Sequence, residues 1–118
     1  MTSAIETFFD AWGVADDAIR AEMIAGTLAP GATYSDPRSG GRLSGDAIAE
    51  YVSAFSANAP GWTAKVENVS DVNGYLRVRV AFGGQGPDGS MMVQHGTYFA
   101  DVSDDALTMI AGFVGAEA

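Results

Sequence analysis

The chain lacks cysteine, which excludes disulfide bonds, a thiol nucleophile and thiolate metal sites, and makes the cytoplasm the expected compartment. Basic residues are few, because 6 Lys and Arg stand against 15 Asp and Glu and leave a formal net charge of −9. This charge repels polyphosphate backbones and anionic headgroups. We therefore expect no nucleic acid and no membrane surface among the partners.

Long hydrophobic runs are also missing. Counting glycine, the longest apolar run covers residues 109–116, well short of the ~20 residues that cross a bilayer. Residues 1–12 contain no Lys or Arg and so lack the basic start of a secretory signal. An apolar content of 47% in 118 residues is nevertheless enough for a continuous core. We expect a single domain over residues 1–118.

The first part of the chain has the apolar periodicity of helices. Ser3 and Glu6 have the spacing of a capping box, and the spacing of the residues that follow predicts a helix over residues 4–12. Asp16 places negative charge at the start of a second helix that ends at Gly26. The predicted buried stripe of this second helix consists of Ile19, Met23 and Ile24.

A short strand is predicted over residues 32–36, closed by Pro37. Ser44 is the expected N-cap of a third helix, which ends at Pro60. The residues expected on one side of this helix are Ile48, Tyr51, Val52 and Phe55.

The second half of the chain has the period of β-strands. Residues 63–72 and 75–82 flank Asn73-Gly74, a strong hairpin signal, and strands are also predicted over residues 91–102 and 107–114. The order of elements predicts an α+β fold in which a curved antiparallel sheet wraps around the N-terminal helices. Such a sheet forms a cone whose open end can take a small molecule.

The last two predicted strands are apolar on both faces. In the first of these strands, one face carries Val93, Thr97 and Phe99, and the other carries Met92, Gln94 and Tyr98. In the second strand, one face carries Ile110, and the other carries Leu107 and Phe113. The helices can cover one face of the sheet, and the simplest cover for the other is a second copy of the chain. We therefore expect a homodimer through the outer face. His95 is out of phase with Tyr98 and is expected at this interface, with a role in the site as the alternative.

Neither a metal nor a cofactor is expected. His95 is the only strong nitrogen ligand, and the aspartates near the C-terminus lack the spacing of a calcium loop. Gly84, Gly86 and Gly89 have the spacing of a dinucleotide-binding glycine motif. The segment leads into a predicted strand rather than a helix, so no helix N-terminus is placed to hold a pyrophosphate.

Asp36 is the first candidate for catalysis. It lies at the end of a predicted strand, on the same face as Tyr34, and the next residue, Pro37, restricts the backbone that follows it. A carboxylate held against aromatic rings loses solvation, which favours proton abstraction from a carbon acid. The alternative is an Asx-turn, in which the side chain only satisfies backbone N–H groups.

Other polar and aromatic residues are candidates for a binding site. A buried phenol without a partner is costly, so Tyr34, Tyr51 and Tyr98 mark a hydrogen-bonded or wet cavity. Arg38 and Arg42 either meet an anionic group of a ligand or are solvated charges. The remaining candidates either line a pocket or form plain core; they are Trp12, Phe55, Trp62, Phe82, Gln94 and Phe113.

Taken in order, several short segments resemble the nuclear-transport-factor-two-like superfamily, in particular its SnoaL-like polyketide cyclase and ketosteroid isomerase branches. The resemblance covers nearly the whole chain. It rests on Trp12 with Asp16-Asp17, on the run Ala32-Thr33-Tyr34-Ser35-Asp36-Pro37, on the helix opening at residues 43–48 and on the ending at residues 110–113.

The resemblance implies roles for individual residues. Asp36 matches the position of the proton-shuttling aspartate of ketosteroid isomerases, while Phe8 and Tyr98 replace the two residues that donate to the oxyanion there. It implies a cofactor-free acid/base enzyme, an isomerase, cyclase or dehydratase of a small hydrophobic carbonyl compound. Asp36 would be the base, and Tyr98, with Tyr34, would stabilise the enolate oxygen. The alternative is a non-catalytic dimeric module that binds a small ligand.

Overall fold

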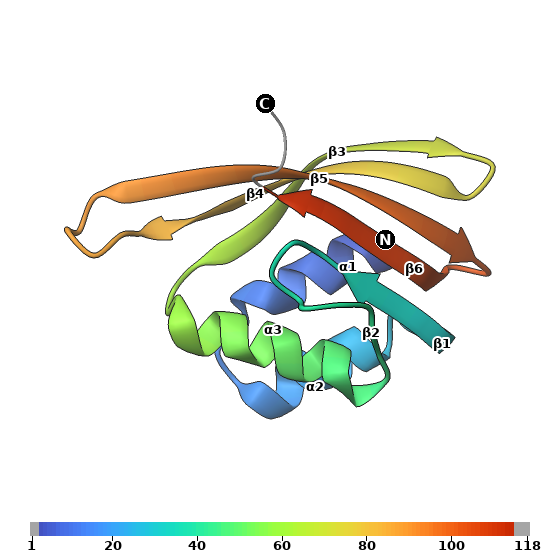
Figure 1. Ribbon diagram of the computed structural model, residues 1–118, viewed down its shortest axis with the longest axis horizontal. Helices are drawn as coiled ribbons and strands as arrows, with labels where there is room; N and C mark the ends of the chain where they lie inside the picture. Colours follow the sequence, from blue (N-terminus) through green and yellow to red (C-terminus); the bar gives the residue numbers. More distant parts are fainter. Residues whose placement is uncertain (1–2, 115–118) are drawn as a thin grey trace.

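In the computed structural model, which describes residues 3–114, three α-helices lie against one face of a six-stranded curved sheet (Figure 1). The predicted α+β class, with a curved sheet over the N-terminal helices, is confirmed. Among the described residues, no helix is long and apolar enough to cross a membrane.

The two N-terminal helices begin at the predicted caps. Helix α1 (Ala4–Asp10) starts with the complete capping box of Ser3 and Glu6. It does not continue to Trp12 as an α-helix, because Ala11–Gly13 forms a 3₁₀ turn, η1. Helix α2 (Asp17–Ala25) is capped by the Asp16 carboxylate, which accepts a hydrogen bond from the backbone N–H of Ile19 at 2.9 Å.

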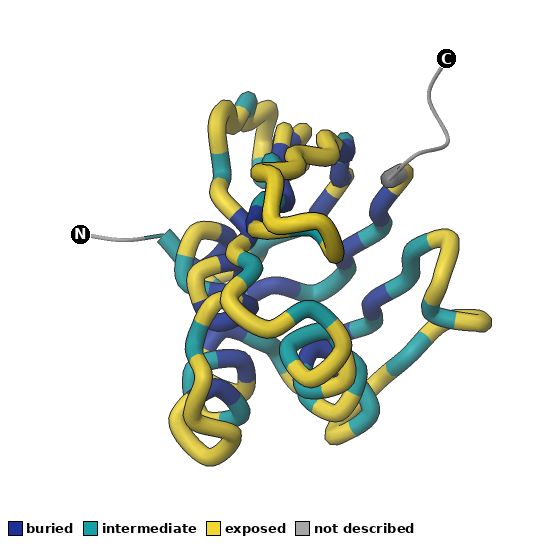
Figure 2. Tube along the Cα trace, turned by 90° about the vertical axis from the view of Figure 1, so that its left-hand side faces the viewer, coloured by how far each residue is buried: buried dark blue, intermediate teal, exposed yellow. Residues whose placement is uncertain are grey.

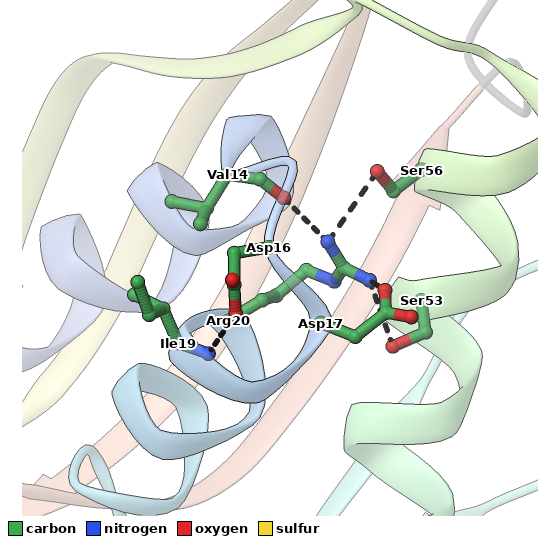
Figure 3. A network of polar contacts seen from close by, with 7 residues as sticks. All are labelled: Val14, Asp16, Asp17, Ile19, Arg20, Ser53 and Ser56. Carbon is green, nitrogen blue, oxygen red and sulfur yellow. Dashed lines mark hydrogen bonds and ion pairs between the residues drawn. The ribbon is translucent and has the colours of Figure 1, made fainter.

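The predicted apolar stripe of α2 is wrong at one position. Ile19 is 53% exposed, whereas Arg20 is only 1% exposed. The Arg20 guanidinium donates to the Val14 carbonyl and forms an ion pair with Asp17 (Figure 3). It also contacts the hydroxyls of two serines on α3 (Asp46–Asn58), Ser53 at 3.1 Å and Ser56 at 3.5 Å. These contacts explain how a charged side chain is buried between two helices.

The first strand is longer than predicted, and the cap of α3 differs. Strand β1 (Leu28–Ser35) begins four residues earlier than expected. Its pairing with β6 is irregular between Leu28 and Thr33, and Pro30 lies within this irregular stretch. Ser44 is not the N-cap, because it lies in β2 (Leu43–Ser44), which pairs with β1. The cap is Gly45, whose φ of +59° favours glycine, and it makes no side-chain cap hydrogen bond.

The sheet has the strand order β2-β1-β6-β5-β4-β3. The hairpin of β3 (Thr63–Val72) and β4 (Tyr75–Gln85) is confirmed, and β5 (Met91–Ser103) and β6 (Ala106–Val114) complete the antiparallel part. The expectation of a wholly antiparallel sheet is wrong for one pair, since β1 and β6 run parallel. The long intervening chain, which includes α3, makes a parallel pairing possible.

Strand β4 alternates between buried and more exposed residues along most of its length, and Figure 2 shows buried segments in both the helices and the sheet. One break in the register corrects a prediction. Leu107 was expected opposite Ile110, yet both are buried in the core. The pairing shifts by one residue after Asp101, which turns Leu107 to the inner face.

No described residue covers the outer face of the sheet. The large apolar side chains that are about half exposed or more there include Val93 at 61%, Phe99 at 46% and Phe113 at 47%. His95 lies on this face as expected, 3.3 Å from the carboxylate of Glu67. The homodimer through this face stays a prediction.

Candidate functional site

A cavity of about 520 Å³ opens between α3, the residues after β1, and strands β4 and β5. In Figure 1 the C-terminal end of α3 lies on the side toward which the β4–β5 hairpin projects. Eight of the ten predicted site residues line the cavity: Trp12, Asp36, Tyr51, Phe55, Trp62, Phe82, Gln94 and Tyr98. Tyr34 and Phe113 are the two that do not.

Asp36 is held by the turn that follows β1. Its backbone N–H donates to the Ser39 hydroxyl at 3.1 Å, and its Oδ1 accepts from the backbone N–H of Arg38 at 2.8 Å. The contact with the Arg38 N–H is the one expected of an Asx-turn. Because only one oxygen makes a backbone contact, the turn orients the carboxylate without using all of its acceptor sites.

Two phenols donate to the same carboxylate. The Tyr51 hydroxyl lies 2.8 Å from both Oδ1 and Oδ2, and the Tyr34 hydroxyl lies 2.6 Å from Oδ2. An ionised carboxylate has about four lone-pair sites. Tyr34, Tyr51 and the Arg38 N–H supply three protons to these sites, and the single Tyr51 proton is shared between the two oxygens.

Tyr98 extends this network by one link. Its hydroxyl lies 3.1 Å from that of Tyr34. Tyr34 has one proton and directs it to Asp36 over the shorter distance, so Tyr98 is the donor to Tyr34. The hydrogen bonds run from Tyr98 through Tyr34 to Asp36. Tyr34 is fully buried and does not line the cavity.

The ring of Tyr98 fits because of a glycine on the neighbouring strand. Gly112 of β6 pairs with Tyr98, and a Cβ at this position would collide with the tyrosine ring. The glycine thus sets the depth at which the Tyr98 ring sits against the sheet.

All three phenols keep their protons near neutral pH. Burial is the largest cause that raises the pKa of Tyr34, Tyr51 and Tyr98 above its ordinary value. The negative charge of Asp36 raises all three further. The phenols can therefore act as hydrogen-bond donors, and none of them is a ready base.

The aromatic candidates serve the cavity and the core together. Trp12 packs against Phe55 at 5.0 Å and against Phe82 at 5.5 Å between ring centroids. Trp12 and Phe82 are almost fully buried, so only part of each ring meets the cavity. Trp62 is fixed by its indole N–H, which donates to the Gln85 carbonyl at 3.0 Å.

Phe113 was predicted to line the site, and this is wrong. It pairs with Thr97, which is out of phase with Tyr98, and therefore lies on the outer face. There its ring packs against Phe99 at 5.9 Å.

The prediction missed several lining residues, although the sequence carried a signal for some of them. Asn58 lies seven residues after Tyr51 on α3, which places both on one side of the helix, and Met92 lies two residues before Gln94. Nothing in the sequence favoured Arg38 over Arg42 as a contact of a ligand. In the structure Arg38 lines the cavity and Arg42 does not. The other missed residues are Pro37, Ala54 and Ala59.

No metal site accompanies this cavity in the described part of the chain. Within residues 3–114, the acidic and histidine side chains form no group of three or more that could hold an ion.

A family model described as the SnoaL-like domain matches residues 5–110. The chain belongs to the SnoaL-like family. This match covers most of the chain and confirms the resemblance drawn from its motifs. No curated protein matches the sequence.

Solved structures of the SnoaL-like family and related folds are similar over nearly the full length. A proposed SnoaL-like isomerase from Agrobacterium tumefaciens is 20% identical, with 94% of this chain and 93% of that chain covered and a TM-score of 0.78. A proposed SnoaL-like polyketide cyclase from Jannaschia sp. CCS1 is 19% identical, with coverage of 96% and 85% and a TM-score of 0.74.

A third structure, from Catenulispora acidiphila, has a ketosteroid isomerase-like fold. It is 12% identical, with coverage of 92% and 82% and a TM-score of 0.77. At these identities the likeness shows that the fold is shared. The activity has to be argued from the cavity of this chain.

Proposed function

We propose that this SnoaL-like protein is an enzyme that moves a proton on a small carbonyl compound, without a cofactor, as an isomerase, cyclase or dehydratase. One observation carries the proposal. The carboxylate of Asp36 lines a cavity with aromatic walls while phenols hold it in place. A carboxylate that is fixed at the wall of a cavity is suited to act as a general base.

The proposed step begins with a C–H bond next to the substrate carbonyl. Asp36 takes this proton, and the electron pair of the C–H bond becomes the π bond of an enolate. The negative charge moves to the carbonyl oxygen. In an isomerase Asp36 returns the proton to another carbon. In a cyclase the enolate carbon forms a bond to a second carbonyl carbon, the π pair of that C=O bond moves to its oxygen, and this oxygen takes the proton from Asp36. No electron donor or acceptor is needed in either case.

The phenols can follow the charge during this step. Before the reaction the negative charge is on Asp36, and the chain from Tyr98 through Tyr34 stabilises it. After proton transfer Asp36 is neutral and the charge is on the substrate oxygen. Tyr98 lines the cavity, so its hydroxyl can turn from Tyr34 toward that oxygen. A hydrogen bond to the oxygen on which charge develops lowers the barrier of such reactions.

A second candidate is a ligand-binding module without catalysis. It is favoured by the number of hydrogen bonds that Asp36 already accepts, from Tyr34, Tyr51 and the Arg38 N–H. In that case the carboxylate would only hold α3 and the end of β1 together.

Deuterium exchange separates the two candidates. The protein is incubated in heavy water with a panel of cyclic ketones, 1,3-diketones and aromatic polyketide-like ketones, and deuterium at the α-carbons is followed by mass spectrometry. We expect wild type to exchange at least one of these compounds and the Asp36→Asn variant to be at least about 100-fold slower.

The matched control is Glu50→Gln on α3. Glu50 is exposed, lies next to Tyr51 in the chain and does not line the cavity. This variant loses one carboxylate and should exchange at the wild-type rate. Ligand binding without exchange across the whole panel would instead favour the binding module.

A further inference from the structure

Arg38 is a cation at the cavity that pairs with no carboxylate of residues 3–114. All six Lys and Arg residues of the chain lie within residues 3–114, and of these only Arg38 lines the cavity. Arg20 pairs with Asp17 and Arg79 with Glu67, whereas Arg38 makes no ion pair with any described residue. A guanidinium at a binding cavity with no partner of its own is available to a ligand.

The backbone that carries Arg38 is fixed. Its N–H donates to Asp36 Oδ1 at 2.8 Å, and the next residue, Ser39, bonds back to the Asp36 carbonyl through its backbone N–H at 3.2 Å and its hydroxyl at 3.0 Å. The start of the side chain is therefore held beside the carboxylate that the proposed reaction uses. The charge of Arg38 also acts within the cavity, because it lowers the pKa of Tyr51 against the larger effect of burial.

The surrounding charge makes this cation distinctive. The chain has a formal charge of −9, and the Asp36 carboxylate lies in the same cavity, so both repel an anionic ligand. Arg38 supplies a planar set of N–H donors that matches the two oxygens of a carboxylate. The side-chain amides of Asn58 and Gln94 line the same cavity and offer further donors.

We propose that the cavity takes a ligand with a carboxylate group, which Arg38 binds, and an aromatic or hydrophobic body, which the aromatic walls contact. If Asp36 catalyses the proposed proton transfer, the ligand is also the substrate, and the substrate class is an aromatic keto acid. Only this second step rests on the proposed function. A neutral ketone of the same shape would bind less tightly, because it leaves Arg38 without a partner.

The test measures binding alone, by isothermal titration calorimetry at low ionic strength. The probes are 2-naphthoate and 2-naphthamide, which share the aromatic body and differ in charge. We expect wild type to bind naphthoate about five- to tenfold more tightly than naphthamide. Arg38→Gln should abolish this preference.

Arg42→Gln is the matched control, because Arg42 lies in the same loop region and outside the cavity. It should keep the wild-type preference. The proposal is overturned if wild type binds the two probes equally, if naphthoate shows no binding at millimolar concentration, or if Arg38→Gln retains the preference. Arg38 is exposed, so its side chain can be replaced without disturbing the core.

The result is independent of the deuterium experiment. Asp36→Asn removes a like charge from the cavity and should bind naphthoate at least as tightly as wild type, whatever happens to exchange. A charge preference in a protein that catalyses no exchange would support this inference and contradict the proposed function. Exchange of neutral ketones without any charge preference would do the reverse.

Discussion

The hydroxyl of Tyr51 on α3 lies 2.8 Å from both carboxylate oxygens of Asp36, which follows β1. This contact joins a helix to the end of a strand across the mouth of the cavity. It places a hydrogen-bond donor symmetrically between the two carboxylate oxygens. The position of the proposed base thus depends on the packing of α3 against the sheet.

The buried phenol of Tyr34 should matter for stability as well as for the site. Tyr34→Phe removes the donor to Asp36 and the acceptor of Tyr98, and it leaves two polar groups without this partner. We expect the free energy of unfolding in urea to fall by about 1–3 kcal/mol. Tyr75→Phe is the control, because Tyr75 is 66% exposed, and its effect should stay within about 0.5 kcal/mol.

Alkaline pH should destabilise the fold through the same phenols. Tyr34 and Tyr98 have a raised pKa in the folded state, so above the ordinary value of 10.0 the unfolded chain releases protons that the folded chain retains. Their stabilising effect is fully present below pH 10 and is lost as the pH rises further. Each contributes a slope of at most about 1.4 kcal/mol per pH unit.

Urea titrations at several pH values between 8 and 11 measure this decline. In the Tyr34→Phe variant, the decline above pH 10 should be shallower than in wild type. An identical slope in both proteins would show that Tyr34 does not hold its proton more tightly in the folded state.

Much of the fold could be predicted from local patterns. The capping box at Ser3, the Asn73-Gly74 hairpin and the alternation in β4 each depend on a few neighbouring residues, and all three are present. The parallel pairing of β1 with β6 depends on residues far apart in the chain. Local periodicity has no information on such a pairing.

Which residues line the cavity could also be predicted in large part from local patterns. Strand and helix periods brought Asp36, Tyr51 and Tyr98 to one cavity. The direction of the hydrogen bonds was not predictable, because it depends on which hydroxyl lies closer to the carboxylate. Phe113 was misplaced because aromatic character alone does not say which face of a strand a residue occupies.

Arg20 should be far more important for stability than its ion-pair partner. Its guanidinium is buried and contacts Val14, Ser53 and Ser56, while the side chain of Asp17 is 86% exposed (Figure 3). We expect Arg20→Ala to lower the free energy of unfolding by about 2–4 kcal/mol, because it leaves these groups unpaired and a void between two helices. Asp17→Asn should cost at most about 1 kcal/mol.

Both variants can be compared by urea unfolding at neutral pH. Equal losses would mean that the ion pair with Asp17, rather than the buried contacts to α3, holds Arg20 in place.

The outer face of the sheet should join two copies of the chain. Phe99 and Phe113 pack together there while each remains about half exposed. We expect light scattering at micromolar concentration to give twice the 12.2 kDa mass of the chain. Phe99→Asp should give a monomer, because the dimer would bury an unpaired charge.

Ile19→Asp is the control for this experiment. Ile19 is also about half exposed, but it lies on α2, away from the outer face of the sheet. This variant should remain a dimer. A monomeric wild-type protein would contradict the assignment of the outer face to a second copy.

The most direct test of the proposed chemistry is the rate of α-proton exchange in heavy water, compared between wild type, Asp36→Asn and Glu50→Gln on one ketone that wild type turns over. Exchange that falls at least about 100-fold in Asp36→Asn and is unchanged in Glu50→Gln is the predicted result. Exchange that proceeds at the wild-type rate in Asp36→Asn would contradict the role of Asp36 as the base.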